Sequence, residues 1–331
     1  MYRIDALRYK ARCNISSMRA LVTGGGGFIG SALASELLEN GHDVRVLENF
    51  ITGERDQIPD GSELIEADLR DRDAVIAASR GIDVVFHQGA IRSVPRSVDQ
   101  PDLVTECNVI GTLNVLIGAA ASGVRRVVYA SSSSVYGDVQ EGLQHEDAAP
   151  NPVSPYAASK LAAEYYCRVW AQLYGVSTIS LRYFNVFGPG QQPDSRYAAV
   201  FPGFVMALSE RRSPEVHWDG QQARDFTYVD DVVAANLAAA SADLRTDGAV
   251  INIGGGDPKT VNEVLRAVSD VLGVWIEPTL LPKRAGDIRR THADISRAKA
   301  ILGWEPRADW KAAVTLTARG IRRKLMNTQH A

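Results

Sequence analysis

A tyrosine and a lysine four residues apart give the strongest indication of chemistry in this 331-residue chain. Tyr156 and Lys160 begin a helix-compatible stretch that runs to Trp170. On a helix this spacing puts both side chains on one face, where an ammonium stabilises a phenolate and lowers the phenol's pKa from about 10. Such a tyrosine can take a proton from an alcohol. Taken alone, the spacing is more often an accidental helical pair.

Upstream, a short apolar strand ends in four consecutive serines, Ser131–Ser134, followed by Val135, Tyr136 and Gly137. The carboxyl ends of parallel strands are where such sheets collect functional groups. A serine hydroxyl beside an acidic tyrosine therefore favours a catalytic interpretation of the pair.

A glycine-rich turn, residues 23–30, follows an apolar strand and precedes a helix-like stretch. Gly24 permits the tight turn, Gly27 lets the backbone approach a pyrophosphate, and Gly30 lets the helix pack on the sheet. The turn predicts a dinucleotide site. Together with the hydroxyl and the tyrosine, it predicts proton removal from an alcohol whose carbon loses a hydride.

The next apolar strand, Val44–Leu47, ends in Glu48. An acidic residue at this position can accept hydrogen bonds from the adenosine ribose and would repel a 2′-phosphate. We therefore expect NAD as the cofactor, although Arg45 and Arg55 leave NADP open as an alternative.

Short β-branched runs alternate with helical stretches, as in a parallel sheet covered by helices on both faces. We predict an α/β fold: a Rossmann-type doubly wound parallel sheet with a smaller, mixed C-terminal substrate cap. Residues 18–188 would bind NAD, with a returning strand near 250–254, and residues 189–331 would mainly form the cap. Residues 1–17 are expected to be a disordered extension. The expected strands are Ala20–Val22, Val44–Leu47, Glu63–Glu66, Val84–His87, Val127–Ala130, Thr178–Arg182 and Val250–Ile253.

Composition and charge favour an ordinary globular protein. The chain is 45% hydrophobic and 23% charged, with a net charge of −3, so neither nucleic acid nor membrane is an expected partner. Its three cysteines lie far apart, without metal-ligand spacing, so we expect no metal site. Without a secretory signal or 18 consecutive apolar residues, the sequence predicts a cytoplasmic protein.

In this order, several motifs resemble those of the extended short-chain dehydrogenase/reductases, and among them the NAD-dependent nucleotide-sugar 4-epimerases. The resemblance covers residues 18 to about 310. The motifs are the glycine-rich turn, Leu47–Asn49, Ala67–Asp71, His87–Ala90, Asn108–Thr112, Ser154–Lys160, Leu181–Gly188, Arg224–Phe226, Asn252–Gly254 and Arg284–Asp287.

The resemblance implies roles for individual residues. Ser132, four residues before the Tyr136–Gly137 pair, would be catalytic with Tyr156 and Lys160. Cofactor contacts would come from Gly24, Gly27, Phe28, Ile29, Gly30, Glu48, Asn49, Asp68, Leu69, Gln88, Gly89, Ala90, Asn108, Tyr156, Lys160 and Phe184. Substrate contacts would come from Ser93, Ser132, Tyr156, Asn185, Ala199, Val200, Arg224, Arg284, Asp287 and Thr291.

The implied substrate is a UDP-sugar, with arginines that match diphosphate oxygens. Thr291, seven residues after Arg284, stands where a bulky tyrosine restricts relatives to plain hexoses. We therefore expect a site that accepts UDP-N-acetylglucosamine as well as UDP-glucose. Arg92, beside Ser93, could instead pair with a uronate, which keeps a UDP-glucuronate 4-epimerase or decarboxylase open.

Three departures and two alternatives accompany the resemblance. Glu48 replaces the family's usual aspartate, and Gly89 and Ile91 replace alanines beside the cofactor. A 4,6-dehydratase is disfavoured because Ser133 and Ser134 stand where that reaction needs carboxylates. A non-catalytic, dinucleotide-binding regulator would be expected to lack the tyrosine or the lysine. By analogy, two helical stretches, residues 103–121 and 156–172, predict a homodimer.

Overall fold

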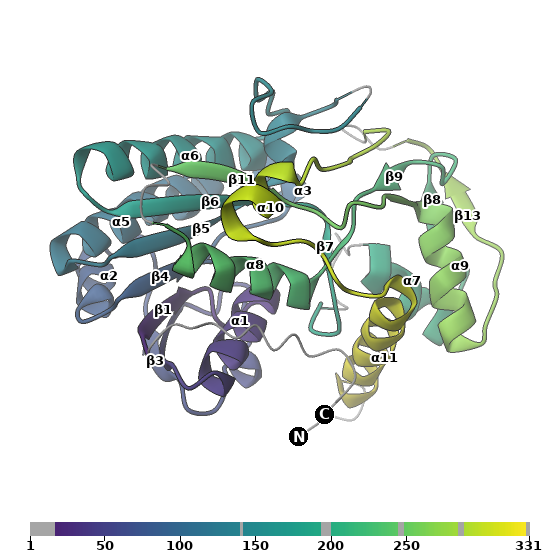
Figure 1. The fold of residues 1–331 in the computed structure, drawn as a ribbon. Coiled ribbons are helices and arrows are strands. Elements are labelled where there is room, and N and C mark those ends of the chain that lie inside the picture. Colours follow the sequence, from purple (N-terminus) through teal and green to yellow (C-terminus); the bar gives the residue numbers. More distant parts are fainter. Residues whose placement is uncertain (1–16, 140–141, 193–199, 244–247, 284–287, 329–331) are drawn as a thin grey trace.

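Seven parallel strands form the central layer of this computed structural model, which describes residues 17–139, 142–192, 200–243, 248–283 and 288–328. The strands run in the order β11-β6-β5-β4-β1-β2-β3, and every neighbouring pair is parallel. Their bounds are β1 Arg19–Thr23, β2 Asp43–Glu48, β3 Glu63–Glu66, β4 Val84–His87, β5 Arg126–Ser132, β6 Ser177–Tyr183 and β11 Ala249–Ile253. The predicted fold class, a doubly wound parallel sheet, is confirmed (Figure 1).

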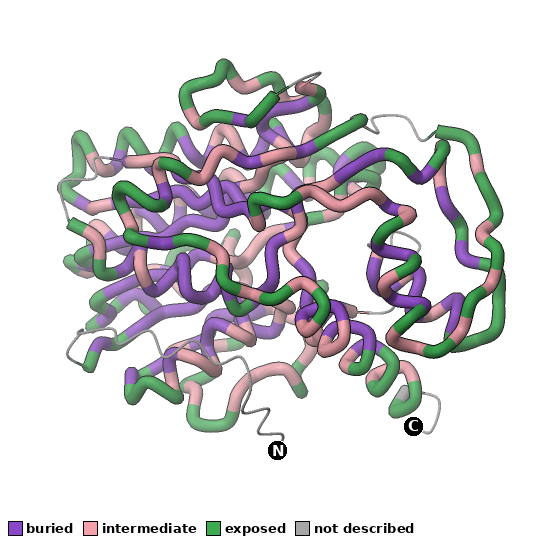
Figure 2. The backbone as a smooth tube through the Cα atoms, turned by 45° about the vertical axis from the view of Figure 1, so that its right-hand side comes forward, coloured by how far each residue is buried: buried purple, intermediate pink, exposed green. Residues whose placement is uncertain are grey.

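Helices cover both faces of this sheet (Figure 1). One face packs against α1, α8 and α10, and the other against α2, α5 and α6. Their bounds are α1 Phe28–Glu39, α2 Arg72–Ser79, α5 Gly111–Ser122, α6 Pro155–Leu173, α8 Val229–Ser241 and α10 Ser296–Leu302. Because strands between two helical layers are apolar on both faces, the inner strands β1, β4, β5 and β6 are almost wholly buried (Figure 2).

A smaller, mixed region lies beyond the carboxyl ends of the strands (Figure 1). Its helices share an apolar core with aromatic residues from the loops. The helices are α7 Val200–Ser209, α9 Val261–Leu272 and α11 Trp310–Thr328. Its two-residue and three-residue strands pair as β7 Val186–Phe187 with β10 Thr227–Tyr228, β8 Glu215–His217 with β13 Thr279–Leu281, and β9 Ala223–Arg224 with β12 Lys259–Thr260.

Helix α6, which carries the predicted tyrosine and lysine, begins at a defined cap. The Ser154 side chain accepts a hydrogen bond of 3.2 Å from the backbone N–H of Ala157. Pro155 occupies the first helical position, where its missing N–H has no partner to lose. Tyr156 is thereby fixed in the first turn, at the end of α6 that faces the cavity.

One long helical run precedes β5. It comprises α4 (Pro101–Thr105), a π-helical turn (Glu106–Ile110) and α5, following the short helix α3 (Val94–Asp99). By length and composition Pro101–Ser122 could cross a membrane, but 56% of its most apolar window is buried inside the fold. Its packing against α2 and α6 explains the apolar composition as that of a core helix.

Candidate functional site

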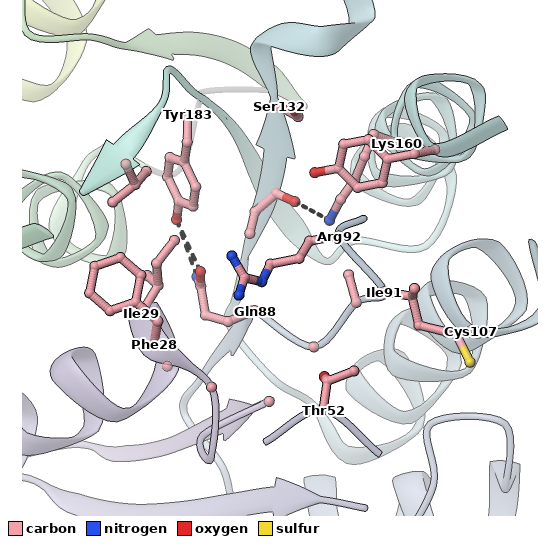
Figure 3. A pocket seen from close by; sticks show the side chains of 18 of the residues that line it. Phe28, Ile29, Thr52, Gln88, Ile91, Arg92, Cys107, Ser132, Lys160 and Tyr183 are labelled. Atoms are coloured by element: carbon pink, nitrogen blue, oxygen red, sulfur yellow. Dashed lines mark hydrogen bonds between the residues drawn. The ribbon is translucent and has the colours of Figure 1, made fainter. Parts of the chain in front are cut away.

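A cavity of about 510 Å³ opens where the parallel strands end and faces the smaller region. The strand order reverses between β1 and β4, which is the position at which doubly wound sheets bind ligands. Figure 3 shows side chains from several elements converging on this cavity. The predicted residues that line it are Gly24, Gly27, Phe28, Ile29, Gly30, Glu48, Asn49, Asp68, Leu69, Gln88, Gly89, Ala90, Ser132, Tyr156, Lys160, Asn185, Arg224 and Thr291.

The glycine-rich turn forms a cradle that larger residues would fill. Gly24 has a φ of 71°, and a Cβ there would lie 2.6 Å from the Cα of Gly89. A Cβ on Gly30 would lie 2.2 Å from the carbonyl oxygen of Gly24. Gly27 caps α1 and lines the cavity, so the free N–H groups of the helix start are close to it. This backbone fits the diphosphate of a dinucleotide.

Glu48 is 7% exposed and lines the cavity. Its Oε2 accepts from the N–H of Gly26 at 3.1 Å, and its Oε1 accepts from the N–H groups of Asn49 and Phe50 at 2.9 and 3.0 Å. The carboxylate therefore ties the glycine-rich turn to the end of β2. Of the two oxygens, Oε2 accepts a single hydrogen bond and keeps one lone pair for a further donor, so the contact with a ribose hydroxyl stays a prediction.

Asp68 marks the end of the cavity predicted to hold adenine. It accepts hydrogen bonds from the Nδ2 of Asn49 at 2.8 Å and from the guanidinium of Arg70 at 2.9 Å. The bonds from Arg70 and Asn49 lower the pKa of this carboxyl to about 2 despite partial burial. Asp68 is thus ionised at neutral pH and holds Asn49 in place.

A buried histidine, His87, links β1 to α5 next to the residues that line the cavity. The Nδ1 of His87 lies 2.7 Å from Thr23 Oγ1, and its Nε2 lies 2.9 Å from Thr112 Oγ1. Thr112 donates to the carbonyl oxygen of Asn108, so its hydroxyl accepts from Nε2–H, which fixes the tautomer. Burial, and secondarily the charge of Lys160, lower the pKa of His87 to about 3. The ring is therefore neutral and structural.

Asn108 does not line the cavity but positions a segment that does. Its Oδ1 accepts from the N–H of Ile91 at 2.8 Å, and its Nδ2 donates to the Ile91 carbonyl at 3.1 Å and to Ser159 Oγ at 3.0 Å. Ile91 lines the cavity next to Ala90. Asn108 thus supports the cavity wall through Ile91, and the cofactor contact predicted for it stays a prediction.

Tyr156 and Lys160 share one face of α6 and both line the cavity. The Lys160 ammonium donates a hydrogen bond of 2.7 Å to the carbonyl oxygen of Ala130, and its Nζ lies 6.0 Å from the centre of the Tyr156 ring. Burial lowers the pKa of Lys160 to about 7.

The predicted lowering of the Tyr156 pKa is wrong for the chain by itself. Burial raises this pKa, while Ser132 and the positive charge of Arg92 act against the rise. Burial of the phenol is the main cause, and the Lys160 ammonium, which is bonded to a backbone carbonyl, is not among the groups that lower this pKa. A positive charge brought beside the phenol by a bound ligand would lower it.

Ser132 ends β5 and presents its hydroxyl to the cavity. Its Oγ accepts two hydrogen bonds from Ser134, one from the N–H at 3.2 Å and one from the hydroxyl at 2.9 Å. Both lone pairs of the oxygen are then in use. Ser132 can therefore act on a bound molecule as a hydrogen-bond donor.

On the side of the smaller region, Asn185 and Thr291 form one connected unit. Asn185 has a φ of 30°, a strained value of the kind found at functional sites. Its Nδ2 donates to the Asp225 carbonyl at 3.1 Å and to Thr291 Oγ1 at 3.2 Å. Thr291 also accepts from the N–H of Asp225 at 3.0 Å and is 5% exposed. Arg224 lines the cavity beside them.

Other predicted residues lie away from the cavity wall. Phe184 is fully buried and packs in a cluster with Tyr136, so its side chain does not reach the site. Ser93 caps α3, accepting from the N–H of Arg96 at 3.2 Å, and Val200 begins α7. Three predicted substrate residues, Ala199, Arg284 and Asp287, lie outside the described residues.

Sequence reasoning missed Tyr183 and Gln192, which both line the cavity. The Tyr183 hydroxyl contacts Gln88 at 3.2 Å and Asn236 at 3.0 Å, which holds the Gln88 side chain at the end of β4 (Figure 3). Tyr183 stands two residues before Asn185 at the end of β6. That position is a signal that could have pointed to it.

Arg92 also lines the cavity, and Figure 3 shows its side chain pointing into it. Within the described ranges, no hydrogen bond or ion pair engages its guanidinium. Its positive charge acts to lower the pKa of Tyr156. Over the same ranges, no group of three or more His, Cys, Asp or Glu could hold a metal ion.

Residues 20–254 match the NAD dependent epimerase/dehydratase family. The UDP-glucose 4-epimerase of Mycolicibacterium smegmatis is 37% identical over 314 residues, covering 93% of this chain and 99% of that protein. A UDP-N-acetylglucosamine 4-epimerase from Methanobrevibacter ruminantium, solved with UDP-N-acetylmuramic acid, has a TM-score of 0.89 at 34% identity, covering 94% of this chain and all of that one. MoeE5, solved with UDP-glucuronic acid and NAD, has a TM-score of 0.84 at 36% identity, covering 92% of this chain and 99% of that one.

The matched family spans the glycine cradle, the Tyr156–Lys160 pair and the strands that position them. The cradle and the carboxylate of Glu48 suit a dinucleotide without a 2′-phosphate. This chain therefore belongs to the NAD dependent epimerase/dehydratase family, as an extended short-chain dehydrogenase/reductase of the nucleotide-sugar epimerase type with NAD as its cofactor.

Proposed function

We propose that this protein is a UDP-hexose 4-epimerase. It would interconvert UDP-glucose with UDP-galactose, and UDP-N-acetylglucosamine with UDP-N-acetylgalactosamine. The observation that carries the proposal is one cavity lined by the glycine cradle, by Tyr156 and Ser132, and by Asn185 and Arg224 on the opposite side. A nucleotide sugar placed between these groups has its sugar beside the phenol.

Proton transfer falls to Tyr156. As the phenolate, it takes the proton from the sugar O4 while C4 loses a hydride, and it returns that proton when C4 regains the hydride. Ser132 donates a hydrogen bond to the reacting oxygen, since its own lone pairs are taken by Ser134. Bound NAD supplies a hydride acceptor and, in its oxidised form, a positive ring that favours the phenolate.

Inversion requires that the transient 4-keto sugar turn within the cavity before the hydride returns to its other face. The nucleotide half must therefore be held more firmly than the sugar. Arg224 supplies a cation for the diphosphate, and the strained Asn185 is fixed by Asp225 and Thr291. The resemblance adds Arg284 and Asp287 to this half of the site.

Thr291 supports the acceptance of N-acetylated sugars. Its side chain is small, lines the cavity and is held by Asn185 and by the Asp225 backbone. A tyrosine at this position would project a ring into the same cavity. The N-acetyl group at C2 therefore has more room here than beside a tyrosine.

A second candidate is a UDP-glucuronate 4-epimerase, or a decarboxylase that begins with the same oxidation. The observation that favours it is Arg92, whose guanidinium points into the cavity (Figure 3) and whose positive charge acts on Tyr156. Guanidinium groups bind carboxylates bidentately, and a uronate carries its carboxylate at C6, two carbons from the reacting C4.

We propose further that two copies of the chain pair through α5 and α6. Helix α6 exposes a row of large apolar side chains, including Leu173, which is 73% exposed. The others are Tyr165, Tyr166, Val169 and Tyr174. Sedimentation should give a dimer, and Leu173→Asp should shift it toward monomer; a wild-type monomer at micromolar concentration would refute the pairing.

Residues 18–188, with the strand near 250–254, are proposed to bind NAD, and residues 189–331 mainly the UDP-sugar. A cytoplasmic location is proposed with them, in keeping with the UDP-glucose 4-epimerase relatives.

The deciding experiment for the function uses the purified protein and three separate substrates. UDP-glucose, UDP-N-acetylglucosamine and UDP-glucuronate are each incubated with it, and the C4 epimers are resolved. We expect the first two to be epimerised without added NAD, since the cofactor is regenerated in each turnover. Turnover of UDP-glucuronate alone would favour the second candidate. Tightly bound NAD with no change in any sugar would favour a non-catalytic regulator.

A further inference from the structure

A buried carboxylate lies one helical turn beyond Lys160. Tyr156, Lys160 and Glu164 follow at four-residue intervals on α6, so they share one face of the helix. The Glu164 side chain is 3% exposed. It is not part of the cavity wall, and the reaction described above does not use it.

Glu164 joins α6 to two strands at once. Its Oε1 accepts from Arg182 Nε at 2.9 Å, and its Oε2 accepts from Arg182 Nη2 at 2.8 Å. The Ser131 hydroxyl also donates to Oε1. Ser131 and Arg182 are register partners on β5 and β6. One carboxylate therefore fixes the ends of both strands against the helix.

These contacts set the distance between the reacting groups. Lys160 holds the Ala130 carbonyl, and Glu164 holds the Ser131 hydroxyl, so two consecutive residues of β5 are tied to two successive turns of α6. Ser132 is the next residue of the strand, and Tyr156 lies one turn earlier on the helix. Their side chains reach the cavity from these two anchored elements.

Glu164 also supplies the negative charge that accompanies the buried ammonium of Lys160. Burying an ammonium without a counter-charge is costly. Burial lowers the pKa of Lys160, and Glu164 raises it. The other titratable or charged groups around this part of the site are Tyr156 and Cys167 on α6, His87 on β4, Tyr129 on β5, Arg182 on β6 and Arg92 in the loop after β4.

Apart from the arginines, the other titratable groups around Lys160 are neutral at neutral pH. The pKa of His87 is about 3 and that of Cys167 about 12, so both are neutral. Burial likewise raises the pKa values of Tyr129 and Tyr156. Arg182 compensates part of the Glu164 charge through the bidentate pair.

We propose that Glu164 is a positioning residue of the epimerase: it fixes Ser132 against Tyr156 through Ser131 and Arg182, and it places a carboxylate one helical turn from Lys160. The inference rests on the proposed function, because it assigns a role in proton transfer by Tyr156. A merely structural ion pair would affect folding alone.

Two substitutions separate position from charge. Glu164→Gln keeps the length and removes the charge, whereas Glu164→Asp keeps the charge and shortens the side chain by one methylene. The matched control is Asp231→Asn on α8, a buried carboxylate whose oxygens accept from the backbone N–H groups of Arg307 and Ala308 at 3.0 and 3.2 Å. Each purified, NAD-loaded variant is assayed for kcat, KM and the pH profile of kcat, with its thermal midpoint.

For Glu164→Gln we expect kcat to fall about tenfold at neutral pH with little change in KM. In the pH profile of kcat, the alkaline limb, on which Lys160 loses its proton, should move to a pH about one unit lower. At a given pH on that limb, kcat is then a further tenfold lower. Glu164→Asp should lower kcat at every pH and leave the alkaline limb of the profile at its wild-type pH. Asp231→Asn should lower the thermal midpoint without moving the limb.

A Glu164→Gln protein that folds, holds NAD and keeps the wild-type kcat and pH profile would overturn the inference. A Glu164→Gln protein whose kcat falls by the same factor at every pH would overturn it as well. If that variant does not fold, Ser131→Ala decides, because it keeps the ion pair and removes one hydroxyl; unchanged kcat in that protein overturns the inference. A wild-type protein that turns over no UDP-sugar would instead refute the proposed function.

Discussion

The ammonium of Lys160 donates a 2.7 Å hydrogen bond to the carbonyl oxygen of Ala130, one residue before the serine run. This contact uses one of the three ammonium protons in a hydrogen bond to the backbone of β5, and it holds α6 to that strand. Lys160 therefore has two tasks: it anchors α6, and it places a positive charge 6.0 Å from the ring centre of Tyr156.

Tyr156→Phe should abolish turnover and leave the fold intact. The variant removes the phenolic oxygen that exchanges the proton with O4, a loss of roughly 10²-fold to 10⁴-fold in kcat for a general base. Epimer formation from UDP-glucose measures the loss, and the thermal midpoint and NAD content report the fold. Turnover within about threefold of wild type would remove Tyr156 from the mechanism.

Thr291→Tyr should suppress the N-acetylated substrates selectively. The added ring occupies cavity volume beside Asn185, and kcat/KM for UDP-N-acetylglucosamine should fall at least about tenfold more than that for UDP-glucose. The control is Thr291→Val, which keeps the size but removes the oxygen that accepts from Asn185 and Asp225. Equal losses on both sugars in the tyrosine variant would contradict the size argument.

Arg92→Met tests what the guanidinium in the cavity binds. If it pairs with a uronate, kcat/KM for UDP-glucuronate should fall by roughly 10²-fold, the effect of losing a charged hydrogen-bond partner, while UDP-glucose is unaffected. A fall on every sugar together with a loss of bound NAD would show that Arg92 serves the cofactor. The measurement is therefore a substrate panel combined with the NAD content of the purified variant.

His87 should make stability depend on pH below neutrality. Its pKa is about 3 in the folded chain and about 6.5 when unfolded, so the unfolded state binds the extra proton between these values. The contribution of His87 to the free energy of unfolding is then fully present above pH 6.5. It falls by about 1.4 kcal/mol per pH unit as the pH drops toward 3.

Urea unfolding of wild type and His87→Gln between pH 4 and 7 measures this slope. We expect a shallower slope in the variant, since glutamine does not titrate. The Asp68 carboxyl, whose pKa is lowered to about 2, adds to the slope only at the acid end of this window, and it does so equally in both proteins. Identical slopes in the two proteins would mean that His87 is not the group responsible.

The sequence by itself determined the elements and the residue types of the site. The glycine-rich turn, the apolar runs of the sheet and the Tyr156–Lys160 spacing are local patterns. Backbone sterics, burial and helical periodicity therefore predict their structures without knowledge of the rest of the chain. The confirmed parallel sheet follows from those patterns.

The tertiary structure decided which partner each polar group meets. The Lys160 ammonium bonds to Ala130, Glu164 joins Ser131 and Arg182, and Phe184 turns into the core. These partners are set by the register of β5 against β6 and by the packing of α6 on both strands. A spacing along one helix cannot specify them, because burial and contacts from distant segments determine both the partners and the pKa values.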